Sequence, residues 1–148
     1  TVPTPIRTQI SVAELFTDLK KLFPEEEFQF EAPSPELKLN ADRTQIEQVL
    51  INLLKNAREA CNRKLDKNIQ VKVKKLSTGN TALTISDNGE GILPDVLDKI
   101  FVPFFTTKTS SSGIGLSLCK QIMTLHDGSI NVKSEIGKGS CFILTFPK

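Results

Sequence analysis

The sequence predicts an α+β fold: a two-layer α/β sandwich with a mixed, mostly antiparallel sheet of about five strands and about three helices on one face. The 148 residues alternate amphipathic helical segments with short strand-like segments. With 39% hydrophobic and 24% charged residues, the composition is typical of a globular domain. The longest apolar runs are far shorter than a membrane span. We therefore expect one domain over residues 1–148.

Helical periodicity predicts two long helices in the first part of the chain, in "SVAELFTDLKKLF" and in "DRTQIEQVLINLLKNAREAC". Each begins with the residues of a capping box, Ser11 with Glu14 and Asp42 with Gln45. In the second part, "LPDVLDKI" predicts a short helix with proline in its first turn. From residue 114 to 125, apolar residues cover more than half of the helical circumference, which indicates a helix packed deeply against a sheet.

Alternation of apolar and polar residues predicts the strands. Two short ones lie on either side of the turn "APSPE". The segments "NIQVKVKKL" and "TALTISD" are joined by "STGN" and predict a hairpin. Two closing strands, "SINVKS" and "SCFILTFP", flank the glycine turn "EIGKG". Residues 1–10 lack such a pattern, and we expect them to be a linker.

Charge and cysteine content narrow the class of protein. Nineteen basic and seventeen acidic residues leave a net charge of +2, too small to favour nucleic acid as a partner. Cys61, Cys119 and Cys141 are far apart within apolar patterns, so we expect buried free thiols in a reducing compartment. The chain begins at Thr1 without a signal peptide pattern, so we expect a fragment of a longer protein.

The stretch "DNGEGI" places a carboxylate at the end of a predicted strand. Asp87 lies on the same face as Leu83 and Ile85, where an unpaired carboxylate would be costly. Its spacing does not fit a calcium loop, a dinucleotide fingerprint or a P-loop. The alternative to a binding role is a tight turn, with Asp87 and Asn88 as turn formers and the glycines at positive φ.

Two further patterns are weak on their own. Asn52 and Asn56 lie one turn apart beside the apolar arc of the long helix, where an amide oxygen could bind Mg²⁺ or hydrogen-bond a neighbouring loop. Gly113 and Gly115 precede a buried helix, where exposed N–H groups could bind an anion or the glycines could serve close packing. The turn "GKGS" before the last strand is equally unspecific.

In this order, the motifs resemble the GHKL superfamily of ATP-binding domains, and within it the catalytic and ATP-binding domain of bacterial sensor histidine kinases. "QVLINLLKNAREA" is similar to the N box of that family and "DNGEGI" to its first glycine box. "FVPFF" is similar to the phenylalanine box, "SSGIGLSL" to the second glycine box and "GKGS" to the last one. The resemblance runs from about Ser11 to the end of the chain.

The resemblance implies a role for each motif residue. Asp87 would accept a hydrogen bond from the exocyclic amino group of adenine, so that the ligand supplies the missing donor. Gly89 and Gly91 would let the backbone pass close to the base, and Ile92, with Ile85, would contact the ring.

For the phosphate end of ATP, the resemblance implies that Asn56 holds Mg²⁺ and that Asn52 supports it. The phosphates would face Gly113, Gly115 and the N–H group of Leu116. Ser140 would reach the adenine side of the site through water.

The family also implies an ATP lid, here residues 104–112, which begins with the nucleotide-binding Phe104. Lys108 is the candidate for the basic residue that many members place against the phosphates, with a solvated lysine as the alternative. Glu59 departs from the family, because many kinases have a lysine there, and adjacent Arg58 points elsewhere on the helix. The only histidine, His126, matches the helix-ending "HGG" pattern, so we expect a capping or core role and a phosphoacceptor outside this chain.

The resemblance therefore predicts a cytoplasmic domain, of a kinase that could be membrane-anchored, that binds Mg-ATP and donates the γ-phosphoryl group to a histidine on a separate dimerisation domain. That domain would form a homodimer in the full-length kinase, with a response regulator downstream and no direct contact of this domain with nucleic acid or membrane. A hydrolysing relative of gyrase, MutL or the heat-shock chaperones is the alternative, but it needs a glutamate where this chain has Asn52. A third alternative is an interaction module that binds nucleotide without turnover.

Overall fold

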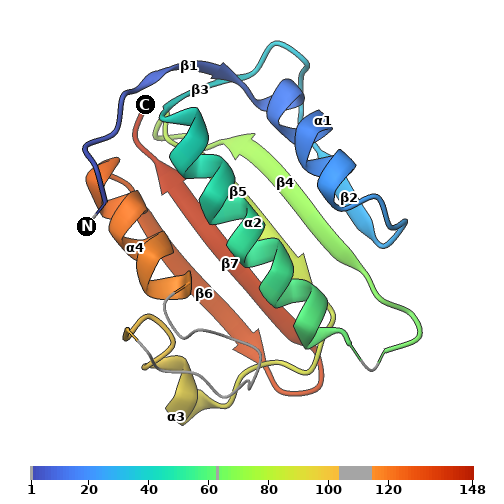
Figure 1. The fold of residues 1–148 in the computed structure, drawn as a ribbon. Helices are drawn as coiled ribbons and strands as arrows, with labels where there is room; N and C mark the ends of the chain where they lie inside the picture. The colour runs from blue at the N-terminus through green and yellow to red at the C-terminus, as the bar shows by residue number, and fades with distance from the viewer. Residues whose placement is uncertain (1, 63, 104–114) are drawn as a thin grey trace.

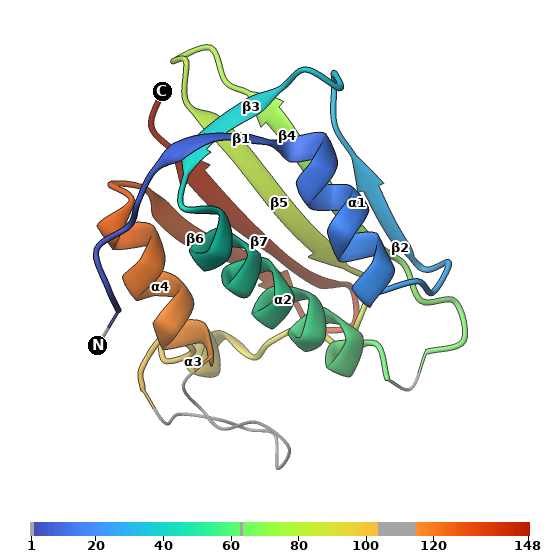
Figure 2. The ribbon, with the colours of Figure 1, turned by 45° about the horizontal axis from the view of Figure 1, so that its top comes forward.

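A five-stranded sheet with helices on one face forms the domain (Figures 1 and 2). The computed structural model describes residues 2–62, 64–103 and 115–148. The strand order is β2-β4-β5-β7-β6, with bounds β2 (Phe28–Glu31), β4 (Ile69–Lys75), β5 (Thr81–Asp87), β6 (Ser129–Glu135) and β7 (Gly139–Phe146). The helices are α1 (Val12–Leu22), α2 (Arg43–Ala60), the short α3 (Pro94–Leu97) and α4 (Gly115–Leu125). The predicted fold class is confirmed.

The sheet is mixed in the way the sequence predicted. β4 and β5 form the expected antiparallel hairpin, and β7 pairs antiparallel with both β5 and β6. Only β2 runs parallel to its neighbour, β4. The segment that connects these two parallel strands contains α2, as parallel pairing requires a long crossover.

A second sheet of two strands was not predicted. Residues of β1 (Thr8–Ser11) pair antiparallel with β3 (Lys38–Ala41), so residues 8–10 of the expected linker form a strand. The two strands predicted around "APSPE" therefore do not pair with each other: β2 joins the large sheet and β3 the small one. Four-residue strands carry too little alternation for the sequence to indicate their partners.

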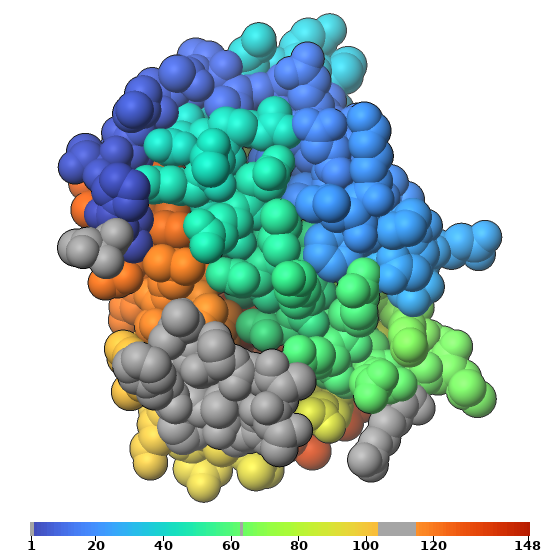
Figure 3. Space-filling view, in the orientation of Figure 1, coloured from blue at the N-terminus to red at the C-terminus, as the bar shows by residue number. Residues whose placement is uncertain are grey.

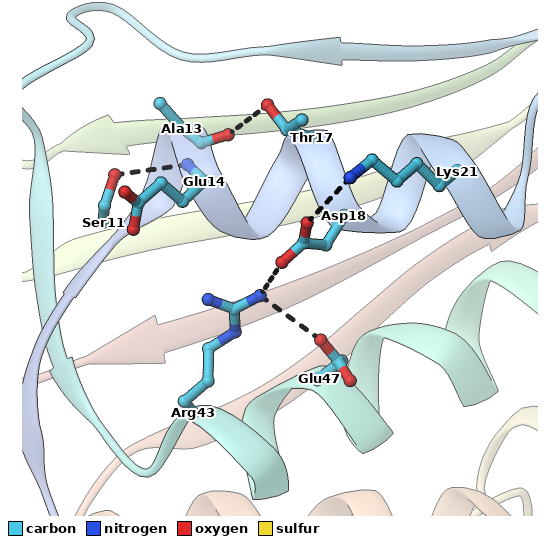
Figure 4. Close-up of polar contacts among 8 residues, drawn as sticks. All are labelled: Ser11, Ala13, Glu14, Thr17, Asp18, Lys21, Arg43 and Glu47. Carbon is cyan, nitrogen blue, oxygen red and sulfur yellow. Dashed lines mark hydrogen bonds and ion pairs between the residues drawn. The ribbon is translucent and has the colours of Figure 1, made fainter.

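The three long helices bury one continuous core against the sheet. The helices α1, α2 and α4 lie over the same face of the sheet (Figures 1 and 2), and the space-filling view shows their atoms side by side on that face of the molecule (Figure 3). The predicted apolar arc of α2 is almost completely buried, including Ile46, Val49, Leu50, Leu53 and Leu54. At the rim, Arg43 of α2 lies between Asp18 of α1 and Glu47 of its own helix and joins the two helices (Figure 4).

The start of α2 differs from the predicted capping box. Asp42 Oδ1 accepts from the backbone N–H of Gln45 at 3.2 Å, as expected of an N-cap. The Gln45 side chain, however, donates to the carbonyl of Pro3 at 2.8 Å. The backbone N–H of Asp42 donates instead to Nε2 of His126 at 3.0 Å. A histidine 84 positions along the chain thus completes the cap.

His126 is 1% exposed, and its Nδ1 lies 2.9 Å from the carbonyl oxygen of Ile122. Because Nε2 accepts a hydrogen bond, Nδ1 carries the proton and donates to that carbonyl. Both ring nitrogens are engaged, which confirms the capping and core role expected for this residue. Within the described ranges, no helix is long and apolar enough to cross a membrane.

Candidate functional site

Polar residues end the sheet on its helix-covered face. Asp87, the last residue of β5, is directly opposite Ser140 of β7, which is opposite Ser134 of β6. Opposed residues of antiparallel strands place their side chains on the same face. Two residues further into the sheet, the same three strands carry a row of apolar residues, Ile85, Phe142 and Val132. The core therefore gives way to hydrogen-bonding groups at one end of the sheet.

The carboxylate of Asp87 is half-buried and has a donor within the chain. Its Oδ1 accepts from the backbone N–H of Gly89 at 2.8 Å. The expectation that a ligand alone supplies the missing donor was therefore wrong in part, because the turn after the strand supplies one donor. This bond fixes the orientation of the carboxylate, which as an acceptor can take more than one hydrogen bond.

The loop after Asp87 is fastened on two sides. The N–H of Glu90 donates to the carbonyl of Ala60 at the end of α2, at 3.1 Å. The carbonyl of Glu90 accepts from the N–H of Gly137 in the β6–β7 turn, at 3.0 Å. Figure 1 shows these three segments together at the end of the molecule where β5 finishes.

Asn88 holds the loop to the chain before β4. Its Oδ1 accepts from the N–H of Asn68 at 2.9 Å, and its Nδ2 donates to the carbonyl of Asp66 at 2.8 Å. This supports the turn-forming role considered for Asn88. The amide is used by the protein itself, which separates Asn88 from the residues that could contact a ligand.

Gly89 and Gly91 lie where the protein leaves no room for a side chain. A Cβ on Gly89 would lie 2.5 Å from the carbonyl oxygen of Ala60. A Cβ on Gly91 would lie 2.3 Å from the carbonyl oxygen of Glu135, and Gly91 has a φ of +79°. Close approach of protein backbone therefore already requires both glycines, whether or not they also face a base as the resemblance implies. The positive φ of Gly91 agrees with the alternative of a tight turn.

Successive turns of α2 line the space between this loop and α4. Asn52 and Asn56 are both half-buried, and one turn beyond them Ala60 meets the loop. At the other end, the position of a Cβ on Gly115 would be 3.8 Å from Cγ of Asn52. The three positions span about 12 Å along the helix axis. The structure therefore brings the predicted asparagines between the first glycine box and the start of α4.

The two asparagines differ in their partners. Nδ2 of Asn52 lies 3.9 Å from Sγ of Cys119 on α4, a weak hydrogen bond to sulfur. The side chain of Asn56 makes no hydrogen bond to any of the described residues. Among the described residues its amide oxygen has no donor, which makes Asn56 a candidate to bind a ligand or a metal ion.

Other predicted residues are only partly placed. Ile92 follows the loop, and its backbone N–H donates to Oγ of Ser134 at 2.8 Å. Gly115 and Leu116 form the first turn of α4 and are half-buried. Phe104, Lys108 and Gly113, with the expected lid over residues 104–112, lie outside the described residues.

Ser134 was missed by the sequence analysis. Besides accepting from Ile92, its hydroxyl donates to the carbonyl of Gly139 at 3.1 Å and lies 2.9 Å from Oγ of Ser140. Its position in alternation on β6, at a polar end, is the only sequence signal that could have indicated it. It connects the loop to the predicted site residue Ser140.

The positive charge of Arg58, next to Glu59 on α2, forms an ion pair outside the candidate site. Arg58 pairs with Glu25 at 2.8 Å, and its guanidinium lies 4.8 Å from the centre of the Phe23 ring. These contacts agree with the expectation that Arg58 points elsewhere on the helix, toward Glu25 and Phe23. Glu59 itself is half-buried on α2.

The three cysteines are free, as predicted, but only Cys61 and Cys119 are buried, while Cys141 is half-buried. Burial raises the pKa of Cys119 to about 12, so its thiol stays protonated beside Asn52. Burial, and then the negative charge of Asp87, raise the pKa of Cys61. These thiols are therefore poor nucleophiles.

A metal site made only of protein side chains is absent from the described ranges, which hold no cluster of three or more His, Cys, Asp or Glu residues suited to a metal. Mg²⁺ rarely uses such clusters and is usually held by few protein oxygens together with substrate phosphates. The amide of Asn56, which has no hydrogen bond to the residues that the structure describes, fits this type of binding.

Comparison with known proteins identifies the family of this chain and finds the same fold in solved structures. The family described as histidine kinase-, DNA gyrase B- and HSP90-like ATPases matches residues 41–148. The catalytic domain of the histidine kinase ThkA, in a nucleotide-free form, superimposes with a TM-score of 0.83 at 36% identity, covering 96% of this chain and 95% of that one. This chain belongs to the family, as a histidine kinase catalytic domain.

Longer histidine kinases contain a similar domain. The sensor histidine kinase ZraS of Salmonella typhimurium is 41% identical over 110 residues, which are 74% of this chain and 23% of ZraS. The chain thus spans about a quarter of the length of the curated relative it matches. ThkA in complex with the response regulator TrrA matches with a TM-score of 0.78 at 34% identity, covering 96% of this chain and 42% of that chain.

Proposed function

We propose that this kinase domain binds Mg-ATP and donates the γ-phosphoryl group to a histidine on a separate dimerisation domain. The observation that carries the proposal is the half-buried carboxylate of Asp87, oriented by Gly89 at the polar end of the sheet. In the family, an aspartate at this motif position accepts from the exocyclic amino group of adenine. Ile85 lies two positions before Asp87 on the same strand and Ile92 ends the loop that follows it, and both would contact the ring.

At the opposite end of the site, the phosphates would face the first turn of α4. Gly115 and Leu116 begin that helix, and N–H groups at a helix start favour anions. We assign Gly113 and Lys108 to the same end, and Phe104 to the nucleotide site, from their motif positions. We further propose that residues 104–112 close over ATP as a lid.

Asn56 would hold Mg²⁺ together with phosphate oxygens, and Asn52 would support it. Bound Mg²⁺ would neutralise phosphate charge as it shifts during transfer. Weak hydrogen bonding to Cys119 keeps the Asn52 amide between α2 and α4. The chain's own contribution is to bind, orient and neutralise, since an imidazole is itself the nucleophile. An imidazole nitrogen would form the new bond to phosphorus as the bond to the β-phosphate oxygen breaks and ADP leaves.

Hydrolysis is disfavoured by the residue one turn before Asn56. The hydrolysing relatives activate water with a glutamate there, and the amide of Asn52 cannot act as a general base. A module that binds nucleotide without turnover remains the competing candidate, distinguished only by assay.

The partners follow from this reaction. The domain needs a histidine-bearing dimerisation domain of the same kinase, which would make the full-length protein a homodimer, and a response regulator that accepts the phosphoryl group. A cytoplasmic position, in a kinase that could carry a membrane anchor elsewhere, agrees with the use of ATP. The proposal includes no nucleic acid and no direct membrane contact.

A transfer assay tests the proposal. The domain is mixed with a histidine-bearing dimerisation domain and γ-labelled ATP, and we expect an acid-labile, alkali-stable phosphoprotein. ATP binding without label transfer would favour the interaction module, and steady phosphate release by the domain alone would favour the ATPase.

Asp87→Asn tests nucleotide recognition separately. The asparagine can still accept from Gly89, so the loop keeps its anchor, but the charged acceptor is lost. We expect the affinity for ATP to fall by about 10- to 100-fold. Unchanged affinity in a folded variant would contradict the assigned site.

A further inference from the structure

The hydroxyl of Ser134 is saturated by its neighbours. A serine hydroxyl has one proton and two lone pairs. The carbonyl of Gly139 can only accept, so Ser134 donates its proton there, at 3.1 Å. One lone pair accepts from the N–H of Ile92 at 2.8 Å. The remaining lone pair faces Oγ of Ser140 at 2.9 Å.

All three bonds can exist together in only one arrangement. Ser134 has no second proton, so Ser140 must donate its own proton to Ser134. The hydroxyl of Ser140, which belongs to a residue only 6% exposed, is therefore committed to β6. It can offer lone pairs in other directions but no proton.

This commitment matters because Ser140 is the cross-strand neighbour of Asp87. Directly opposed side chains in an antiparallel pair have Cβ atoms about 5 Å apart, within reach of a hydroxyl–carboxylate hydrogen bond. A hydroxyl normally donates to a nearby carboxylate, because a charged acceptor gives the stronger bond. Here Ser140 instead donates its proton to Oγ of Ser134, on the opposite side from Asp87.

We propose that Ser134 is a positioning residue that holds the Ser140 proton away from Asp87, so that the Ser140 hydroxyl does not compete with the adenine amino group for that carboxylate. The inference rests on the proposed function, in which Asp87 recognises adenine. It adds a second role to the anchoring of Ile92, and the two roles predict different results for a double variant.

The test compares ATP dissociation constants, measured by calorimetry, for variants of the 148-residue chain. In Ser134→Ala, Ser140 loses its acceptor and turns to Asp87, and we expect affinity to fall about tenfold. Ser134→Thr retains the hydroxyl and should bind ATP like the wild type. Ser134→Cys has a weak acceptor; it should shift affinity in the same direction by less, and it carries the test if Ser134→Ala does not fold.

The double variant Ser134→Ala/Ser140→Ala separates the two roles. Removing the competing hydroxyl should restore most of the affinity lost in Ser134→Ala, to the level of Ser140→Ala alone. If Ser134 only anchors the loop, the double variant will bind no better than Ser134→Ala, and that result would overturn the inference. Affinity in Ser134→Ala equal to the wild type would overturn it as well.

A crystal structure of nucleotide-free Ser134→Ala, or of Ser134→Cys in its place, makes the test independent of ATP. Oγ of Ser140 should lie within about 3 Å of a carboxylate oxygen of Asp87. A hydroxyl that still points toward β6 would refute the inference. Wild-type protein that binds no ATP would refute the proposed function, while this structure would still decide where the Ser140 proton goes.

Discussion

The two ends of helix α2 use polar residues in opposite ways. At its N-terminal end, Asp42 accepts from Gln45 and from the N–H of Ile6, and its own N–H donates to His126. In its C-terminal half, and within the described part of the chain, Asn52 has only a weak bond to sulfur and Asn56 has no hydrogen bond. Polar groups satisfied by the protein stabilise the fold, whereas those left open can bind a ligand.

The same contrast separates residues that look alike in the sequence. Asn88 and Asn56 are both asparagines of conspicuous motifs, but Asn88 bonds to Asn68 and Asp66 and so belongs with the structural group. His126, the only imidazole, is likewise consumed by the cap of α2. The predictions below test this division between stability and ligand binding.

The largest expected effect concerns the loop after β5, which packs between the C-terminal end of α2 and the β6–β7 turn. Gly91→Ala would place a Cβ 2.3 Å from the Glu135 carbonyl oxygen, at a φ of +79°. We expect the free energy of unfolding to fall by about 4 kcal/mol, from overpacking and backbone strain together. Urea denaturation measures this.

Gly137→Ala is the matched control for Gly91→Ala. Gly137 has a similar φ of +82°, but nothing lies within 4 Å of its Cβ position. The loss should be about 1 kcal/mol, from backbone strain alone. Equal losses in the two variants would show that contact with Glu135 does not constrain the loop.

At the N-terminal end, His126→Ala should destabilise the domain by about 3 kcal/mol, because a buried ring is lost and the N–H of Asp42 loses its acceptor. Thermal unfolding measures the loss. Below the transition, the dissociation constant for Mg-ATP should stay within about twofold of the wild type. A large change in nucleotide affinity in the folded variant would contradict the inference that the N-terminal end of α2 serves stability and not ligand binding.

Asn56→Ala should weaken nucleotide binding and leave stability nearly unchanged, the reverse of His126→Ala. Its effect on the binding free energy should be smaller than the loss of stability in His126→Ala. We expect affinity for ATP in the presence of Mg²⁺ to fall about tenfold, toward the value measured with the metal chelated by EDTA. Stability should change by less than about 0.5 kcal/mol. Gln48→Ala, which removes an exposed amide two turns earlier on the same helix, is the control and should leave both quantities unchanged.

The smallest effect is the pH dependence of the α2 cap. The hydrogen bond from the Ile6 N–H, more than any other interaction, lowers the pKa of Asp42 below that of an ordinary aspartate. A lowered pKa means that Asp42 stabilises the fold above about pH 4, where it would be charged even when unfolded, and that this contribution is lost as pH falls further.

Asp42→Asn keeps an N-cap acceptor but removes the charge. Between pH 4 and pH 2 the wild type should lose more stability than the variant, by less than about 1 kcal/mol because solvent screens this partly exposed carboxylate. Parallel acid denaturation curves for the two proteins would contradict the role assigned to the carboxylate.

Much of the local structure could be predicted because it depends on neighbours in the chain. Periodicity over 11 and 18 residues identified α1 and α2, and alternation identified the β4–β5 hairpin, since its partners are joined by a short turn. The order of motifs indicated the family, which the comparisons confirm, and predicted which residues form the nucleotide site. None of these inferences required a contact between distant segments.

What only the tertiary structure decided depends on such distant contacts. The partner of β1 is about 30 positions away, the acceptor for the Asp42 N–H is 84 positions away, and Gly91 is constrained by Glu135. The sequence shows which residues can form hydrogen bonds. Folding decides which of them bond to one another and which, like Asn56 among the described residues, have no partner, because a hydrogen bond needs its two atoms about 3 Å apart whatever their separation in the chain.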